Sequence, residues 1–261
     1  MKKLYVIPNV DDIGASQALA TEYGAAFEYN DFYFPTVLDN KETVEKLIAF
    51  YKALERDRSE DTLHGVFLDV TVHSADPYIR EISDRRIRQS LSIARELGVC
   101  AVIFHTNTIP NFRNESYVKG WINANERYWR AIAEEFSDLE IYMENMFDEE
   151  PQTLAALAER MSDVENFGIC FDYAHSNVFG DGGREWFELF APYIKHTHIN
   201  DNDKISDLHG TIGEGSIDFA LFDREMRALG REVSVLIEMK DCAAQRRSIE
   251  YLKEHGIYPF N

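Results

Sequence analysis

Short apolar runs alternate with amphipathic helical segments eight times along this chain of 261 residues. Runs with the character of β-strands occupy residues 4–7, 24–29, 64–70, 101–104, 139–143, 167–171, 193–199 and 233–237. Segments with helical character follow them at residues 16–23, 41–55, 79–97, 117–136, 151–161, 184–190, 218–229 and 242–255. Near-continuously apolar strands that alternate with helices indicate parallel strands covered by those helices. Eight such units predict one α/β domain over residues 1–261, a (β/α)8 barrel.

An open doubly wound sheet is the alternative arrangement of alternating strands and helices. That fold commonly carries a Gly-x-Gly-x-x-Gly loop after its first strand, and no such loop follows residues 4–7. Barrels of about 250 residues are routine, so the length of the chain also favours a single TIM barrel. Hydrophobic residues make up 45% of the chain and aromatic residues 13%, which is enough for a sizeable core.

The net charge of the chain is −19, from 46 acidic and 27 basic residues. Such a charge repels phosphates and argues against nucleic acid as a partner. No run approaches the roughly 18 apolar residues of a membrane span, and the N-terminal run is too short for a signal peptide. The three cysteines, Cys100, Cys170 and Cys242, lie in or beside apolar segments and are expected to be reduced thiols of a cytoplasmic protein. Whether the chain forms a homo-oligomer stays open.

Four of the expected strands end in a side chain that commonly binds metal ions. These side chains are Glu144, Asp172, His198 and Glu238. Because the active site of a (β/α)8 barrel lies at the carboxyl ends of its strands, the four are expected to converge there on one cation. Carboxylate and imidazole donors suit Mg²⁺, Mn²⁺, Co²⁺ or Zn²⁺.

The loops that follow the strand ends carry further candidate residues. They are His73, His105, His175, Asp207 and His209. The other three histidines fall outside this set. His64 opens the expected third strand and should lie at the opposite end of the barrel, and His196 should lie one layer below His198. His255, on the last expected helix, should be solvated.

Three short motifs resemble those of a known family. They are Phe-Asp-Tyr-Ala-His at 171–175, His-Ile-Asn-Asp at 198–201 and His-Gly-Thr-Ile-Gly-Glu-Gly at 209–215. Together with the order of elements along the whole chain, they resemble the xylose-isomerase-like barrels, also called AP endonuclease family 2. That family includes the ketose 3-epimerases and endonuclease IV.

The resemblance implies a different metal content in each branch. In the epimerase branch, one divalent metal is held by the four strand-end residues, Glu144 and Glu238 also act as catalytic acid and base, and His175 contacts the substrate. In that case His73, His105 and His209 are expected to contact the substrate as well. In the endonuclease IV branch, three zinc ions are held by nine residues. Position by position these are His73, His105, Glu144, Asp172, His175, His198, Asp207, His209 and Glu238, and all nine residue types are present.

The loops at the strand ends favour a small sugar over DNA. Residues 9–14 and 30–40 contain no Lys or Arg, whereas aromatic residues are frequent in these loops. Aromatic faces beside fixed polar groups suit a polyol. The sequence therefore predicts a metal-dependent isomerase or epimerase of a sugar or sugar phosphate, acting by proton transfer next to a carbonyl. The alternative is a zinc phosphoesterase with a multinuclear site. A sugar-binding barrel without turnover is a third interpretation, which the intact Glu144/Glu238 pair disfavours.

Overall fold

Eight parallel strands form a closed barrel in chain order in the computed structural model, which describes residues 4–261. The strands are β1 (Leu4–Val6), β2 (Ala26–Tyr29), β3 (Thr62–His64), β4 (Ala101–His105), β5 (Glu140–Glu144), β6 (Phe167–Asp172), β7 (Ile194–Ile199) and β8 (Ser234–Ile237). Strand β1 pairs with both β2 and β8, which closes the barrel. The predicted single-domain (β/α)8 TIM barrel is therefore confirmed.

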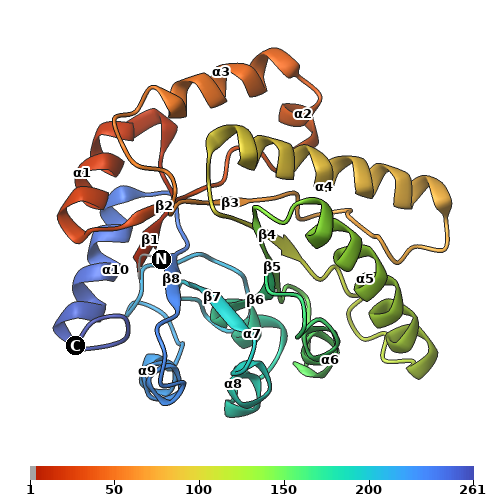
Figure 1. Cartoon of the computed structure of the whole chain (residues 1–261). Coiled ribbons are helices and arrows are strands. Elements are labelled where there is room, and N and C mark those ends of the chain that lie inside the picture. The colour runs from red at the N-terminus through yellow and green to blue at the C-terminus, as the bar shows by residue number, and fades with distance from the viewer. Residues whose placement is uncertain (1–3) are drawn as a thin grey trace.

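A ring of helices surrounds the strands, as Figure 1 shows in a view along the barrel. The predicted helices are α1 (Ile13–Tyr23), α3 (Lys41–Lys52), α4 (Pro77–Leu97), α5 (Glu115–Glu135), α6 (Gln152–Arg160), α8 (Arg184–Phe190), α9 (Phe219–Ala228) and α10 (Cys242–Glu254). Three short helices were not predicted: η1 (Val10–Asp12), α2 (Pro35–Leu38) and α7 (Tyr173–Phe179). Each follows a strand at the carboxyl end of the barrel, where turns of only three to seven residues give little periodic signal.

Local capping sets the ends of the long helices. Helix α4 begins after Asp76, whose side chain accepts the N–H of Tyr78, and Pro77 occupies the first turn. Helix α1 ends at Gly24, which has a φ of 66°. A left-handed residue of this kind terminates a helix, so Gly24 caps α1 and does not open β2 as the sequence suggested.

Strand β3 lies earlier in the chain than predicted, and the expectation for His64 was wrong. The pairing of Leu63 with Val102 and of His64 with Ile103 makes His64 the last residue of β3. The next residue, Gly65, still donates its N–H to Ile103, but a Cβ there would lie 2.5 Å from the ring of Phe104. The chain then leaves the sheet, so the apolar residues 66–68 belong to a loop. His64 consequently lies at the carboxyl end of the barrel.

The register of the sheet brings polar strand ends side by side. His105 of β4 is paired with Glu144 of β5, and Asp172 of β6 is paired with His198 of β7. All four side chains are buried. The fold therefore collects ionisable groups at one end of an otherwise apolar barrel.

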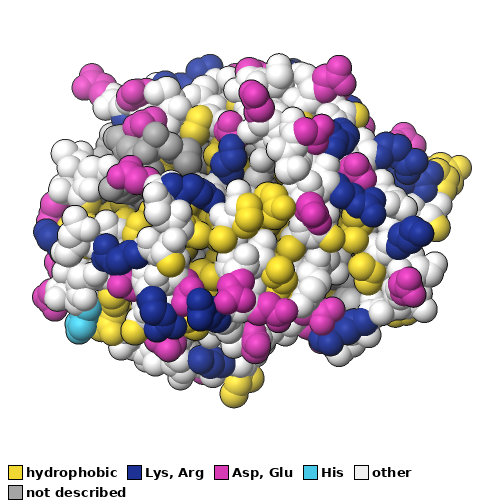
Figure 2. All heavy atoms as spheres, turned by 60° about the horizontal axis from the view of Figure 1, so that its bottom comes forward, with side chains coloured by type: hydrophobic (Ala, Val, Ile, Leu, Met, Phe, Trp, Pro, Cys, Tyr) yellow, Lys and Arg dark blue, Asp and Glu magenta, His cyan; other side chains and the backbone are white. Residues whose placement is uncertain are grey.

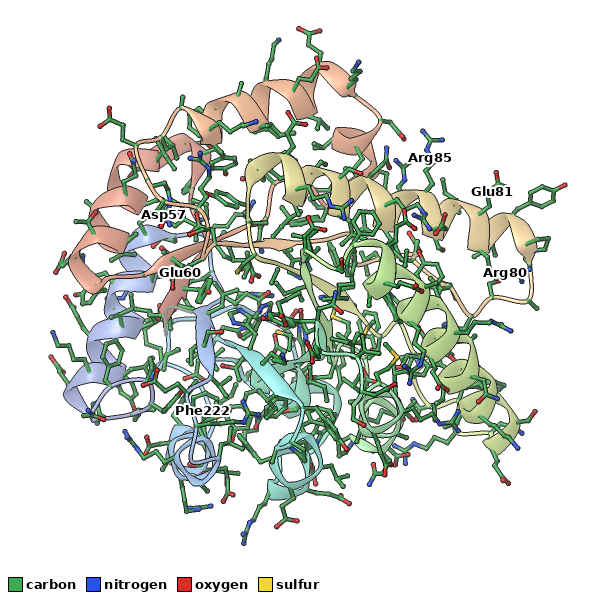
Figure 3. The ribbon with its side chains drawn as sticks, in the orientation of Figure 1. Asp57, Glu60, Arg80, Glu81, Arg85 and Phe222 are labelled. Carbon is green, nitrogen blue, oxygen red and sulfur yellow. The ribbon has the colours of Figure 1, made fainter. Side chains whose placement is uncertain are left out.

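The outer surface carries both positively and negatively charged side chains. Figure 2 shows acidic and basic side chains interspersed over the face turned to the viewer, and Figure 3 shows Arg80, Glu81 and Arg85 projecting from α4. Among residues 4–261, no helix combines the length and apolar character that crossing a bilayer requires. The cysteines are free thiols, with Cys170 buried and Cys100 and Cys242 partly buried.

Candidate metal centre and its pocket

Four strand ends place one set of ligand atoms together in the barrel. Glu144, Asp172, His198 and Glu238 each offer an atom, and these atoms lie within 4.8 Å of one another. Nδ1 of His198 is 3.3 Å from Oε2 of Glu144 and 3.6 Å from Oε1 of Glu238. We call these four residues the central group. It is the set that the sequence predicted to hold a metal.

Several buried atoms of the central group have no hydrogen bond to any part of the chain within residues 4–261. They are both carboxylate oxygens of Glu144, Oδ2 of Asp172, Nδ1 of His198 and Oε2 of Glu238. Buried polar atoms normally have partners, and exceptions call for an explanation. Three carboxylates and one imidazole that face one another without hydrogen bonds match the donor set of a divalent cation. The residues therefore fit a metal ion.

Electrostatics and burial displace the pKa values of the central group in both directions. Burial opposes ionisation of Glu144, but the neighbouring imidazoles of His105 and His198 lower its pKa well below the usual range. Burial likewise opposes protonation of His198, yet nearby acidic groups, Glu144 and Glu28 among them, raise its pKa well above the usual value. In Asp172 burial dominates and raises the pKa. Such displaced pKa values are common at functional sites.

A second group lies on one side of Glu144. It consists of His64, His105 and Glu144. Nε2 of His105 lies 3.1 Å from Oε2 of Glu144 and 3.2 Å from Nε2 of His64. Nδ1 of His64 lies 2.9 Å from the carbonyl of Gly65, which can only accept a hydrogen bond from it, and Nε2 faces the group. Glu144 is thus shared between this set and the central group.

A third group lies at the mouth of the barrel. Nε2 of His175 and Nε2 of His209 lie 3.4 Å and 3.2 Å from the same oxygen of Asp207. The Nδ1 atoms face carbonyls, that of Asn145 at 3.0 Å and that of Glu238 at 2.8 Å. Burial opposes protonation of His209, but Glu238 and Asp207 raise its pKa to about 10. Both imidazoles are therefore oriented with Nε2 toward Asp207.

Asp201 fixes the loop that carries the third group. Its carboxylate accepts the N–H of Gly213 at 2.9 Å, of Gly215 at 3.0 Å and of Ile217 at 3.1 Å. A Cβ at Gly215 would lie 2.3 Å from Oδ1 of Asp201, so this close approach requires glycine. The structure thereby explains the two motifs at 198–201 and 209–215. The motif at 198–201 supplies the acceptor, Asp201, and the motif at 209–215 supplies the donor N–H groups of Gly213 and Gly215.

His73 does not join the candidate ligands. Its Nε2 lies 3.4 Å from the hydroxyl of Tyr117, and its ring lies beside Trp121. It neither lines the pocket nor belongs to any of the four clusters of candidate ligands among residues 4–261, which are the three groups above and Cys170 with His196 and His198. The other eight of the nine residues matched to the endonuclease IV pattern lie in these clusters. His64, which was not in that set of nine, lies among them in place of His73. His255 is hydrogen-bonded to its own helix at the surface.

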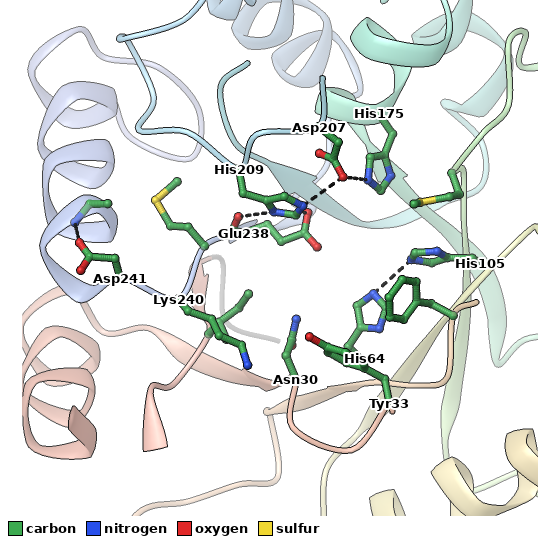
Figure 4. Close-up of a pocket in the computed structure, with 15 residues that line it drawn as sticks. Asn30, Tyr33, His64, His105, His175, Asp207, His209, Glu238, Lys240 and Asp241 are labelled. Carbon is green, nitrogen blue, oxygen red and sulfur yellow. Dashed lines mark hydrogen bonds and ion pairs between the residues drawn. The ribbon is translucent and has the colours of Figure 1, made fainter. Parts of the chain in front are cut away.

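A pocket of about 400 Å³ opens above the groups. Its lining comprises Ile7, Asn30, Tyr33, His64, Phe67, His105, Met146, His175, Asp207, His209, Glu238, Met239, Lys240, Asp241 and Ala244. Figure 4 shows His175 and His209 on one side and Asn30, Tyr33 and Lys240 on the other, with His64 beside Tyr33. Lys240 is the single basic side chain of this lining apart from histidine, and Asp31 lies 3.3 Å from its ammonium. The pocket thus suits a small molecule better than a polyanion.

Sequence reasoning missed Glu28, which is fully buried on β2 beneath the central group. Its Oε1 lies 3.2 Å from Nε2 of His198, and its Oε2 lies 3.3 Å from Nε2 of His196. Burial opposes ionisation, but these two imidazoles lower the pKa of Glu28 below its usual value. The available signal was a single acidic residue inside an apolar strand. His196 lies one layer below His198, as the sequence predicted.

The family model of the xylose isomerase-like TIM barrel matches residues 18–255. The chain belongs to this family. An uncharacterized protein of Methanocaldococcus jannaschii, MJ1311, is 28% identical over 211 residues, which cover 77% of this chain and 71% of that protein. A ketose 3-epimerase of Arthrobacter globiformis is 25% identical, with 64% of this chain and 58% of that protein covered. A probable endonuclease 4 of Mycobacterium ulcerans is 23% identical, with 74% and 77% covered.

The solved structure of a D-tagatose 3-epimerase-like protein has the same fold. It superposes with a TM-score of 0.74 at 25% identity and covers 97% of both chains. The resemblance read from the sequence is therefore confirmed. This xylose isomerase-like barrel has named relatives in two enzyme classes, one of epimerases and one of endonucleases.

Proposed function

We propose that this xylose isomerase-like barrel is a divalent-metal-dependent isomerase or epimerase of a small sugar or sugar phosphate. The observation that carries the proposal is the convergence of Glu144, Asp172 and His198 on Glu238, which lines the pocket. Each of the four would hold the ion. The named epimerase relatives support the same reaction class.

The chemistry is proton transfer at the carbon between a carbonyl and a hydroxyl. A bound divalent ion polarises the carbonyl and so makes the adjacent C–H more acidic. One carboxylate of the Glu144/Glu238 pair takes the proton as the C–H bond breaks, and the electron pair of that bond leaves the substrate as its enediolate. For isomerisation the same carboxylate returns the proton to the neighbouring carbon, and for epimerisation the other glutamate returns it from the opposite face.

The remaining pocket residues bind and orient the substrate. His105, His175 and His209 line the pocket, and Nε2 of His175 and of His209, which both face Asp207, would hold a substrate hydroxyl beside that carboxylate. Tyr33 and Phe67 offer an aromatic edge and face on the other side, with ring centroids 5.0 Å apart. A polyol has one apolar face and a rim of hydroxyls, and this combination of walls matches it.

A second candidate is a phosphoesterase with a multinuclear zinc site. The observation that favours it is the presence of two more ligand groups, one with His64 and His105 beside Glu144 and one with His175, Asp207 and His209. Two-metal and larger clusters catalyse phosphoester cleavage by holding both the attacking and the leaving oxygen. The net charge of −19 and the single lysine of the pocket disfavour duplex DNA as its substrate.

Metal stoichiometry and turnover measured on one preparation separate the two candidates. The purified chain, saturated with Mn²⁺, Co²⁺ or Zn²⁺ in turn, is analysed for metal and assayed on ketoses, ketose phosphates and bis(p-nitrophenyl) phosphate. We expect one tightly held ion per chain and interconversion of a ketose with solvent hydrogen exchange at the reacting carbon. Three ions per chain with phosphodiester hydrolysis and no ketose turnover would establish the second candidate and contradict the first.

A further inference from the structure

Glu28 is a buried acid on a strand that supplies no residue to the ligand groups. It lies in the middle of β2, is fully inaccessible to solvent and stands one layer below the central group. A buried carboxylate without a role in folding or function is rare, because desolvation of the charge costs several kcal/mol unless hydrogen bonds offset it. Its partners therefore indicate what it does.

Three groups surround the carboxylate of Glu28. The hydroxyl of Thr62, which is paired with Glu28 across the sheet, donates at 2.8 Å. The Nε2 atoms of His196 and His198 lie at ion-pair distances of 3.3 Å and 3.2 Å from its two oxygens. Nδ1 of His196 lies 2.6 Å from the hydroxyl of Ser234, which holds the other edge of that ring. Both imidazoles therefore turn the Nε2 edge of the ring toward this carboxylate.

The two nitrogens of His198 consequently face opposite environments. Nε2 faces Glu28, and Nδ1 faces Glu144 and Glu238 of the central group. Only an unprotonated ring nitrogen can bind a metal, and the hydrogen bond of one nitrogen decides which tautomer is present. A carboxylate behind the ring also makes the ligating nitrogen a better donor to the ion.

We propose that Glu28 is a positioning residue that holds the Nε2 edge of the His198 ring and so presents Nδ1 to the metal. This assignment rests on the proposed metal dependence of the site. It gives β2 a part in the centre although β2 contributes no ligand. Thr62, His196 and Ser234 complete the arrangement by holding the carboxylate and the neighbouring ring.

Replacing Glu28 with glutamine tests the assignment. An amide has one accepting and one donating end, so it cannot accept from both imidazoles. Either His196 or His198 must then turn an unprotonated Nε2 toward the amide, and for His198 this moves the proton onto Nδ1. We expect Glu28→Gln to weaken Zn²⁺ binding by roughly 10- to 100-fold, as for other residues that support a metal ligand.

One control accompanies this variant in the full-length protein. Asp61→Asn alters another buried carboxylate, which holds Arg56 and Tyr29, and should change stability without changing Zn²⁺ affinity. Affinities come from chelator competition well below the melting temperature. A Glu28→Gln variant that binds Zn²⁺ within about twofold of wild type would overturn the assignment.

The protonation of His198 gives a readout that needs neither metal nor activity. In the metal-free wild-type chain, long-range ¹⁵N–¹H spectra recorded across a pH series should show a pKa of His198 above the usual value, and Glu28→Gln should lower that pKa because it removes one of the carboxylates that raise it. An unchanged pKa of His198 in Glu28→Gln would contradict the assignment. If the wild-type chain binds no divalent cation, the proposed function fails, and this titration alone decides whether Glu28 acts on His198.

Discussion

Oε2 of Glu144 lies 3.1 Å from Nε2 of His105. The carboxylate proposed as acid or base on β5 is therefore also in contact with a histidine of the neighbouring strand β4. The same oxygen lies 3.3 Å from Nδ1 of His198. Glu144 therefore connects the central group to the pair formed by His64 and His105. How many ions the centre holds depends on whether these two imidazoles bind a metal or a substrate.

Replacement of either catalytic glutamate should abolish turnover while the barrel stays folded. Glu144→Gln and Glu238→Gln each remove a ligand charge and a proton-transfer group, so kcat should fall by roughly 10²–10⁴-fold or more. Circular dichroism and the melting temperature of the metal-free protein check the fold. As a control, Glu149→Gln alters an acid of the β5–α6 loop that pairs with Arg113, and it should retain activity. Activity near the wild-type value in Glu144→Gln or Glu238→Gln would remove both from the mechanism.

His209→Ala separates a substrate contact from a metal ligand. In a single-metal sugar enzyme the ion content stays at one per chain, and loss of one charged hydrogen bond lowers kcat/KM by about 10- to 100-fold. His105→Ala should behave in the same way. His73→Ala serves as the matched control, because His73 contacts Tyr117 and not the pocket, and it should leave metal content unchanged. Loss of a full equivalent of zinc from His209→Ala would contradict the single-metal centre.

Abasic-site DNA should not be cleaved at physiological salt. Duplex binding typically needs roughly six to ten phosphate contacts. The pocket lining carries one lysine, and this lysine already faces Asp31. The measurement is nicking of a labelled abasic duplex by nuclease-free protein loaded with Zn²⁺. Efficient nicking that disappears in both His105→Ala and His209→Ala would establish the endonuclease-like alternative.

Metal affinity should fall as the pH is lowered. In the metal-free chain, the surrounding carboxylates raise the pKa of His198 well above its usual value, so a proton must leave this ring when an ion binds. Each displaced proton weakens binding by about tenfold for every unit by which the pH falls below the pKa of the group. Calorimetric titrations with Zn²⁺ at pH 6 and pH 8, in buffers of low and of high ionisation enthalpy, measure both the affinity and the number of protons released. Equal affinity at the two values would show that His198 is unprotonated before the ion binds.

Asp201→Asn should destabilise the loop that carries Asp207 and His209. An amide keeps the shape of the side chain but weakens three charge-assisted bonds to backbone N–H groups, so the free energy of unfolding should fall by about 2–4 kcal/mol. Glu214→Gln is the control, because the side chain of Glu214 lies in the same loop but is exposed to solvent, 3.5 Å from the exposed Arg247, and its melting temperature should barely change. Thermal unfolding of the metal-free proteins compares the two. Equal melting temperatures would show that the loop does not depend on Asp201.

The barrel and its central group were accessible from the sequence because both follow from local pattern. Apolar strands that alternate with helices leave few possible architectures, and the carboxyl ends of barrel strands always meet at one face. Glu144, Asp172, His198 and Glu238 could therefore be placed together from their positions at strand ends. The motifs at 171–175 and 209–215 also pointed to the family that the comparison confirmed.

The places of His64, His73 and Glu28 were decided only by the tertiary structure. An apolar run does not show where a strand leaves the sheet, and the pairing of β3 with β4 ends the strand at His64. The loop that follows carries His73 away to Tyr117. Glu28 reads as one acid in an apolar strand until the closed barrel sets it between His196 and His198. Contacts among β2, β3 and β7 depend on the register and closure of the whole sheet, and those are set by packing across the barrel and not by any single segment.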